Sequence, residues 1–199
     1  MRPATDSSIP LPDGTTYRTV PVHQGIKVIR TWAEHPWPMT RKQALTLRDH
    51  FGWTSSPTKE HIFTTNHNTR PKDASFTTRN DGTVSTFDLK LSSFAPIELD
   101  PLTQPLAWAA FETYLEVLRQ LYGQGKKERR KEVTSVTWTL SSGASIRFAT
   151  TGSLVNTTIH SPEYNEAAAA EEVYFDEYIS YEDEFRQVPV QPSKYQHGQ

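Results

Sequence analysis

The chain has 199 residues, of which 35% are apolar, and its 21 basic and 23 acidic side chains give a net charge of −2. This length suits one domain with tails, and the 5 tryptophans, 8 tyrosines and 9 phenylalanines are too many for an intrinsically disordered chain. The lack of cysteine excludes disulfides, thiol nucleophiles and cysteine-bound zinc, and the slightly acidic balance disfavours general binding of nucleic acid.

The N-terminal residues 1–23 are rich in proline, threonine and serine, which predicts a loose arm. From residue 24 the pattern changes, because Ile26, Ile29 and Ala33 lie at helical spacing. They predict a short helix that ends before Pro36.

A second helix is predicted over residues 41–51. Thr40 is suited to cap its start, and Gln43 three residues later completes a capping box. Gly52 suits the left-handed position that follows a helix. These signals define both ends of the helix.

Strands are predicted next in the chain. Residues 61–67 alternate weakly, and residues 75–80 and 83–91 flank Asp81-Gly82, a pair typical of a two-residue hairpin turn. In the last of these strands every second residue is apolar, which indicates a half-buried antiparallel strand.

The longest helix is predicted from Pro105, which suits a first turn, to Gly123, which closes it. Its apolar stripe consists of Leu106, Ala110, Tyr114, Val117, Leu118 and Leu121. The following residues, 126–131, include five basic residues in six. We interpret them as a solvated loop, with contact to phosphates as the alternative.

Three further strands alternate apolar with polar residues. Their apolar positions are Val136, Trp138 and Leu140, then Ile146 and Phe148, then Val155 and Ile159. Two groups of strands separated by a helix predict an α+β fold, with a mainly antiparallel sheet of about six strands in two meanders and helices packed on one face. We expect the two groups to join into one sheet, and the five tryptophans to lie in the core or at its edge.

The C-terminal part of the chain is acidic. We expect one α+β domain over residues 24–185, with an acidic helix from about residue 165, and a tail over residues 186–199. Between Ser161 and Phe185 there are nine acidic residues and no basic one, and tyrosines are interleaved with them. Such a segment is either a solvated helix face or a surface for a basic partner. The residues expected to bind the partner are Glu171, Glu172, Tyr174, Asp176, Glu177, Tyr178, Tyr181, Glu182 and Asp183.

No motif of catalysis or cofactor binding occurs in the sequence. His61 and His67 lie in one predicted strand, but no metal-binding motif surrounds them, and we interpret them as surface or core residues. Gly123 and Gly125 follow a helix, whereas a dinucleotide-binding loop follows a strand. We therefore expect no catalytic residue, no cofactor and no metal. The lack of a long apolar run or a signal-peptide stretch leads us to expect a cytoplasmic protein without membrane or direct nucleic-acid partners.

Several aromatic and glycine anchors carry a family resemblance. The string Pro36-Trp37-Pro38-Met39-Thr40 precedes the second helix, and Phe51-Gly52-Trp53 closes it. The later anchors are Ala110-Phe111 and Gly123 in the long helix, then Val136-Thr137-Trp138 and Ser161-Pro162-Glu163-Tyr164. Over about residues 26–165 this layout resembles a family of small actinobacterial proteins of uncharacterised function.

Such proteins are similar, in size and α+β layout, to the immunity proteins that neutralise secreted polymorphic toxins. The resemblance implies a non-catalytic, cytoplasmic protein that binds a cognate toxin domain, one with a basic surface, and blocks its active site. Two other classes stay open. One is a chaperone-like or secretion-accessory binding protein, which would present an apolar groove, and the other is an enzyme with an unrecognised site.

Overall fold

The computed structural model describes residues 8–67 and 69–171. The chain divides into two compact units, Met1–Asn165 and Glu166–Gln199. The strands of the first unit are β1 Ser8–Pro10, β2 Thr16–Arg18, β3 Thr54–Ser56, β4 Lys59–Thr64, β5 Ala74–Thr78, β6 Val84–Lys90, β7 Lys126–Arg130, β8 Val133–Thr139, β9 Ser145–Thr151 and β10 Leu154–His160. Its helices are α1 Val22–Ala33, α2 Arg41–His50, α3 Asp100–Tyr122 and the short 3-10 helix η1 Ile97–Leu99. Residues 162–171 are helical as well.

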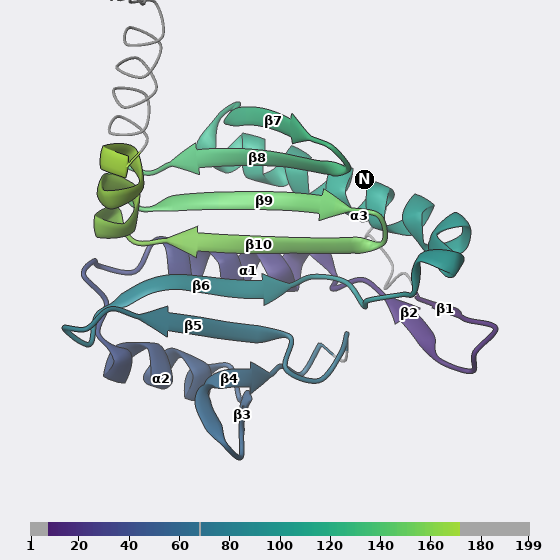
Figure 1. The fold of residues 1–199 in the computed structure, drawn as a ribbon, viewed down its shortest axis with the longest axis horizontal. Coiled ribbons are helices and arrows are strands. Elements are labelled where there is room, and N and C mark those ends of the chain that lie inside the picture. The colour runs from purple at the N-terminus through teal and green to yellow at the C-terminus, as the bar shows by residue number, and fades with distance from the viewer. Residues whose placement is uncertain (1–7, 68, 172–199) are drawn as a thin grey trace, which may run out of the picture. The chain divides into compact units, whose positions relative to one another are not determined.

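The main sheet confirms the α+β class but is larger than predicted. It has eight antiparallel strands in the order β3-β4-β5-β6-β10-β9-β8-β7 (Figure 1), where the sequence predicted about six. Pairing of β6 with β10 joins the two meanders, as expected. The two additional strands are the edge strands β3 and β7. Neither strand was predicted from the sequence, because β3 has only three residues and all five residues of β7 are charged.

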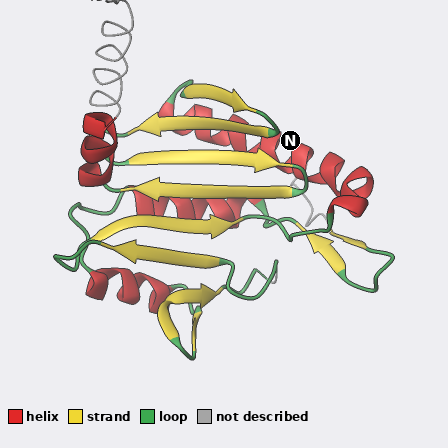
Figure 2. Ribbon diagram, in the orientation of Figure 1, coloured by secondary structure: helices red, strands yellow, loops and turns green. Residues whose placement is uncertain are grey.

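The helices α1, α2 and α3 cover one face of this sheet, as predicted (Figure 2). Their apolar sides meet the alternate strand residues that face them, and the pairing register places these residues in rows across the sheet. One such row contains Phe76, Phe87, Ile159, Ile146 and Trp138, each at most 2% exposed. The core therefore lies between the helices and this face, and burial of such large side chains stabilises the layered arrangement.

Aromatic stacking organises the centre of the core. The Trp32 ring of α1 lies on the Phe87 ring of β6, with centroids 3.7 Å apart and planes at 6°. Trp53 is also nearly parallel to Phe87, at 6.2 Å. The expected core position is confirmed for Trp32, Trp53 and Trp138. It is wrong for Trp108, whose side chain is exposed.

The second predicted helix is confirmed as α2. The hydroxyl of Thr40 accepts a hydrogen bond from the Gln43 amide at 3.3 Å, and the Gln43 side chain accepts one from the Thr40 amide at 2.8 Å. This is the predicted capping box. Gly52 follows the helix with φ of +66°, a conformation that suits glycine.

The long helix α3 begins five residues earlier than predicted, at Asp100. Pro101 occupies its first turn, and Pro105 lies inside the helix. The cost of Pro105 is small this close to the N-terminus, since the carbonyl that loses its donor belongs to the first turn. The buried face is Thr103, Ala107, Phe111, Tyr114, Leu115 and Leu118. The predicted stripe is therefore partly wrong, and Leu121 is 41% exposed.

The N-terminal arm is not loose over its described part. Strands β1 and β2 form a two-stranded antiparallel sheet. Tyr17 of β2 is fully buried, and its hydroxyl donates a hydrogen bond to the Ser153 carbonyl. Burial raises the pKa of Tyr17 to about 12. A proline-rich segment thus joins the core through one aromatic side chain, a contact that composition alone does not reveal.

Candidate binding surface

The segment that leads from β6 into α3 exposes several large apolar side chains to the solvent. Six large apolar side chains are exposed in the described part of the chain, and four of them lie between residues 94 and 108. They are Phe94 (64% exposed), Ile97 (74%), Leu102 (49%) and Trp108 (46%), and we call them the apolar patch. In Figure 1 the first turns of α3 project beyond the ends of the neighbouring strands.

Small residues hold this segment against the core. Ala95, Thr103 and Ala107 are buried, and Leu99 and Leu106 are partly buried against the core, whereas Ile97 and Leu102 between them are exposed. The Thr103 hydroxyl donates to the Leu99 carbonyl at 3.1 Å, and the Leu99 amide donates to the Pro96 carbonyl at 2.9 Å. An ordinary surface helix buries its large apolar side chains, whereas here several of them are exposed beside buried small residues. This pattern is typical of a surface that binds another macromolecule.

Stacking on other aromatic rings holds the Trp108 side chain in place. Its ring stacks on Phe111 with centroids 5.3 Å apart, and Phe111 stacks on the buried Phe148 at 4.8 Å. The three stacked rings extend from the solvent to the sheet. An exposed indole supported in this way loses little conformational freedom when a partner covers it.

A groove lies beside Trp108, between α3 and strands β7, β8 and β9. It encloses about 200 Å³ and is lined by Gln104 and Trp108 of α3, Arg129 of β7, and Thr134 and Thr150 of the neighbouring strands. Thr150 is only 4% exposed, and its hydroxyl has no hydrogen-bond partner among the residues described. Glu132 lines the groove as well, so the groove offers an aromatic ring and side chains of both charges to an incoming group.

The basic run at residues 126–131 is strand β7 and its turn, so the predicted loop is wrong. β7 pairs with β8 along its whole length. Lys127 and Arg129 stand opposite Val136 and Thr134, on the face that carries the helices. On the other face the Lys126 ammonium lies 3.0 Å from the Glu128 carboxylate. This hydrogen bond lowers the pKa of Glu128 below its usual value.

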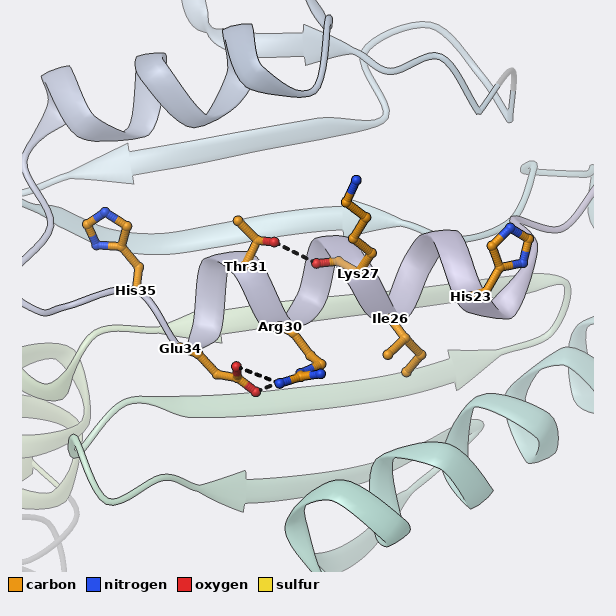
Figure 3. Close-up of a pocket in the computed structure, with 7 residues that line it drawn as sticks. All are labelled: His23, Ile26, Lys27, Arg30, Thr31, Glu34 and His35. Atoms are coloured by element: carbon orange, nitrogen blue, oxygen red, sulfur yellow. Dashed lines mark hydrogen bonds and ion pairs between the residues drawn. The ribbon is translucent and has the colours of Figure 1, made fainter.

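A second hollow, of about 490 Å³, lies over the exposed side of α1 (Figure 3). Arg30 and Glu34 point to one side of the helix, and Lys27 and Thr31 point to the other. The Arg30 guanidinium donates to Glu34 at 2.9 and 3.1 Å, and the Tyr122 hydroxyl donates to Glu34 at 2.8 Å. The hydrogen bond from Arg30 lowers the pKa of Glu34. These charges are satisfied within the surface itself, so we regard the apolar patch and its groove as the better candidate.

The residues predicted from the sequence to bind a partner fall almost entirely outside the described part. Glu171 is helical and exposed. The positions Glu172, Tyr174, Asp176, Glu177, Tyr178, Tyr181, Glu182 and Asp183 lie outside the described residues. The role of the acidic segment therefore stays a prediction.

The apolar patch was missed because three of its four residues lie in a proline-rich link, between the predicted strand 83–91 and the predicted helix that starts at Pro105. Phe94, Ile97 and Leu102 follow no strand or helix period, since they span an irregular stretch, η1 and the start of α3. The available signal was their size, because three large apolar residues are unusual in a solvated link.

Two kinds of feature are absent from the described residues. Residues 8–67 and 69–171 contain no group of three or more histidine, aspartate or glutamate side chains placed to hold a metal ion. Among the helices described, none has the length and apolar character to cross a membrane.

Comparison with known proteins gives a family but no activity. No curated protein and no solved structure matches the chain. Residues 23–161 match the model of a family of unknown function, DUF6301. The match spans α1 to the end of β10, which includes the apolar patch, the groove and β7. This chain is therefore a member of the DUF6301 family.

Proposed function

We propose that the chain is a binding protein of the immunity type. It acts in the cytoplasm of an actinobacterium and neutralises a cognate toxin domain by covering its active site, without catalysing a reaction. The observation that supports this proposal best is the apolar patch. Four exposed large side chains within one short segment suit contact with a protein, because tryptophan and other large apolar residues contribute most to the affinity of protein interfaces.

The groove beside Trp108 supports the same proposal. Its volume of about 200 Å³ is suited to one large side chain of a partner and is small for a cofactor. A side chain inserted there would contact the Trp108 ring and lie near the charged groups of Arg129 and Glu132. The groove thus resembles an anchor pocket at the edge of an interface more than an active site.

The test of the patch uses the toxin domain encoded by the neighbouring gene. We expect Trp108→Ala to weaken binding of this domain at least about thirtyfold, since a central tryptophan contributes about 2 kcal/mol or more. Calorimetric titration measures the dissociation constants. The matched control is Leu121→Ala, which removes another exposed side chain of α3 about 20 Å along the helix. It should change the affinity less than about threefold.

Equal effects of the two variants would contradict the proposed interface. A patch that binds many unrelated unfolded proteins with similar affinity would favour the chaperone-like alternative. Neutralisation that consumes substrate or forms a product would favour the enzyme.

The acidic segment has a separate role in the proposal. Its carboxylates would attract a toxin surface that is basic because it holds nucleic acid or a phosphorylated cofactor. Replacement of Glu172, Glu177 and Asp183 by lysine is expected to slow association about tenfold and to flatten its dependence on salt. Stopped-flow association at several salt concentrations measures both effects. An unchanged association rate would remove the acidic segment from the interface and leave the apolar patch in place.

A further inference from the structure

We propose that β7 accepts an acidic, extended segment of another protein, which adds to the main sheet as a further strand. This inference goes beyond the proposed function. It rests on the edge of the sheet, which adjoins the groove through Arg129, and does not require that the chain bind a toxin.

The first argument is the geometry of the two sheet edges. β7 is the last strand at one edge, and its five residues pair with β8 without a shift of register. The strand at the opposite edge, β3, has three residues and a register shift between Ser55 and Ser56. Short, irregular edge strands resist pairing, whereas a regular edge strand presents unpaired amide and carbonyl groups to an added strand. Only β7 combines length with regularity.

The second argument is charge. Lys126, Lys127, Arg129 and Arg130 make four of the five residues of β7 basic. In the described part of the chain, Lys126 is paired with Glu128, while Lys127, Arg129 and Arg130 have no ion-pair partner. Like charges oppose pairing of β7 with a second β7, since cross-strand neighbours of one sign repel. The same charges favour an acidic strand.

The third argument is that both faces of the edge are basic. Lys127 and Arg129 face the side of the helices, where Arg129 lines the groove beside Trp108. Lys126 and Arg130 face the other side, where Arg147 lies in the same cross-strand row as Lys126. An added strand therefore meets cations on both of its faces. The occupant that fits is a segment with consecutive acidic residues, which suits β-strand addition to an exposed edge.

The test uses a capped peptide, Glu-Glu-Thr-Glu-Glu, whose central threonine falls opposite Glu128 in either direction. The full-length protein is titrated and followed by NMR, and hydrogen exchange is measured at the β7 amides. We expect shifts confined to β7 and β8 and slower exchange of the β7 amides that do not pair with β8. The same peptide with methylated backbone nitrogens keeps its charge but loses its donors, so it should bind at least about tenfold more weakly.

Charge is tested with two matched double variants. Lys127→Glu with Arg129→Glu is expected to weaken binding of the peptide at least about tenfold. Lys42→Glu with Arg70→Glu makes the same change in net charge on exposed residues elsewhere and should change binding less than about twofold. Circular dichroism of both variants shows whether the fold is retained.

Several results would overturn the inference. Equal binding of the methylated peptide would show attraction without strand addition, and equal binding of Lys-Lys-Thr-Lys-Lys would exclude selection by charge. Peptide-free protein that dimerises through β7 would identify a second copy as the occupant. Single-stranded DNA that displaces the peptide and shifts the same amides at lower concentration would identify a nucleic acid.

Discussion

Replacement of Gly25 by alanine is expected to destabilise the fold by about 3 kcal/mol, although alanine is the better helix former. Gly25 is buried in α1, and a Cβ atom there would lie 2.7 Å from Cε1 and Cζ of the Tyr114 ring and closer still to its hydroxyl oxygen. Tyr114 is fully buried, and its hydroxyl donates to the Val20 carbonyl at 3.0 Å. Because the Tyr114 ring is fully buried, relief of this clash requires α1 and α3 to move apart or the surrounding core to shift. Urea unfolding measures the loss.

A double-mutant cycle separates this clash from other effects. Tyr114→Phe alone removes the hydroxyl and leaves the Val20 carbonyl without its donor, at a cost of about 1–2 kcal/mol. In the Tyr114→Phe background, Gly25→Ala should be less destabilising by at least about 1 kcal/mol, because the nearest atom is gone. An alanine variant as stable as the parent would show that helix propensity outweighs the close approach.

Replacement of Trp32 by alanine is expected to cost about 3–5 kcal/mol. The side chain is fully buried and stacks on Phe87, so its removal leaves a large cavity between α1 and the sheet. Trp32→Phe should cost much less. The Trp32 indole nitrogen has no hydrogen-bond partner among the described residues, and phenylalanine removes this unsatisfied donor.

Trp138 is the matched comparison. It is as deeply buried, but its indole nitrogen donates to the Gly123 carbonyl at 2.9 Å. Trp138→Phe therefore loses a hydrogen bond and should be more destabilising than Trp32→Phe by about 1 kcal/mol. Thermal and urea unfolding of the two phenylalanine variants give the comparison. A larger loss for Trp32→Phe would mean that packing, and not the indole nitrogen, decides the cost.

The elements that the sequence predicted best are those whose signals are local. The capping box of Thr40 and Gln43 involves residues three positions apart, and the turn at Asp81-Gly82 involves adjacent ones. The alternation in β6, β8, β9 and β10 also follows from the chain itself, since one face of each strand is buried. These features required no knowledge of distant contacts.

The errors occurred where a distant contact decides the outcome. The charged residues of β7 form a strand because β8 supplies the pairing groups, and Tyr17 is buried because Ser153 lies beside it. The candidate site has the same origin. Trp108 was expected in the core or at its edge, and its exposure depends on the rotation of α3, which turns Ala107 and Phe111 toward the sheet.

The amino-acid sequence by itself therefore determined the class of the fold, the alternation of its strands and the signals that begin and end α2, because backbone geometry and hydrophobic periodicity act over a few residues. Only the tertiary structure decided that β7 is an edge strand and that Phe94, Ile97, Leu102 and Trp108 face the solvent. Strand neighbours and helix rotation are set by packing between segments far apart in the chain. An apolar side chain therefore becomes a candidate for binding only when the folded structure leaves it uncovered.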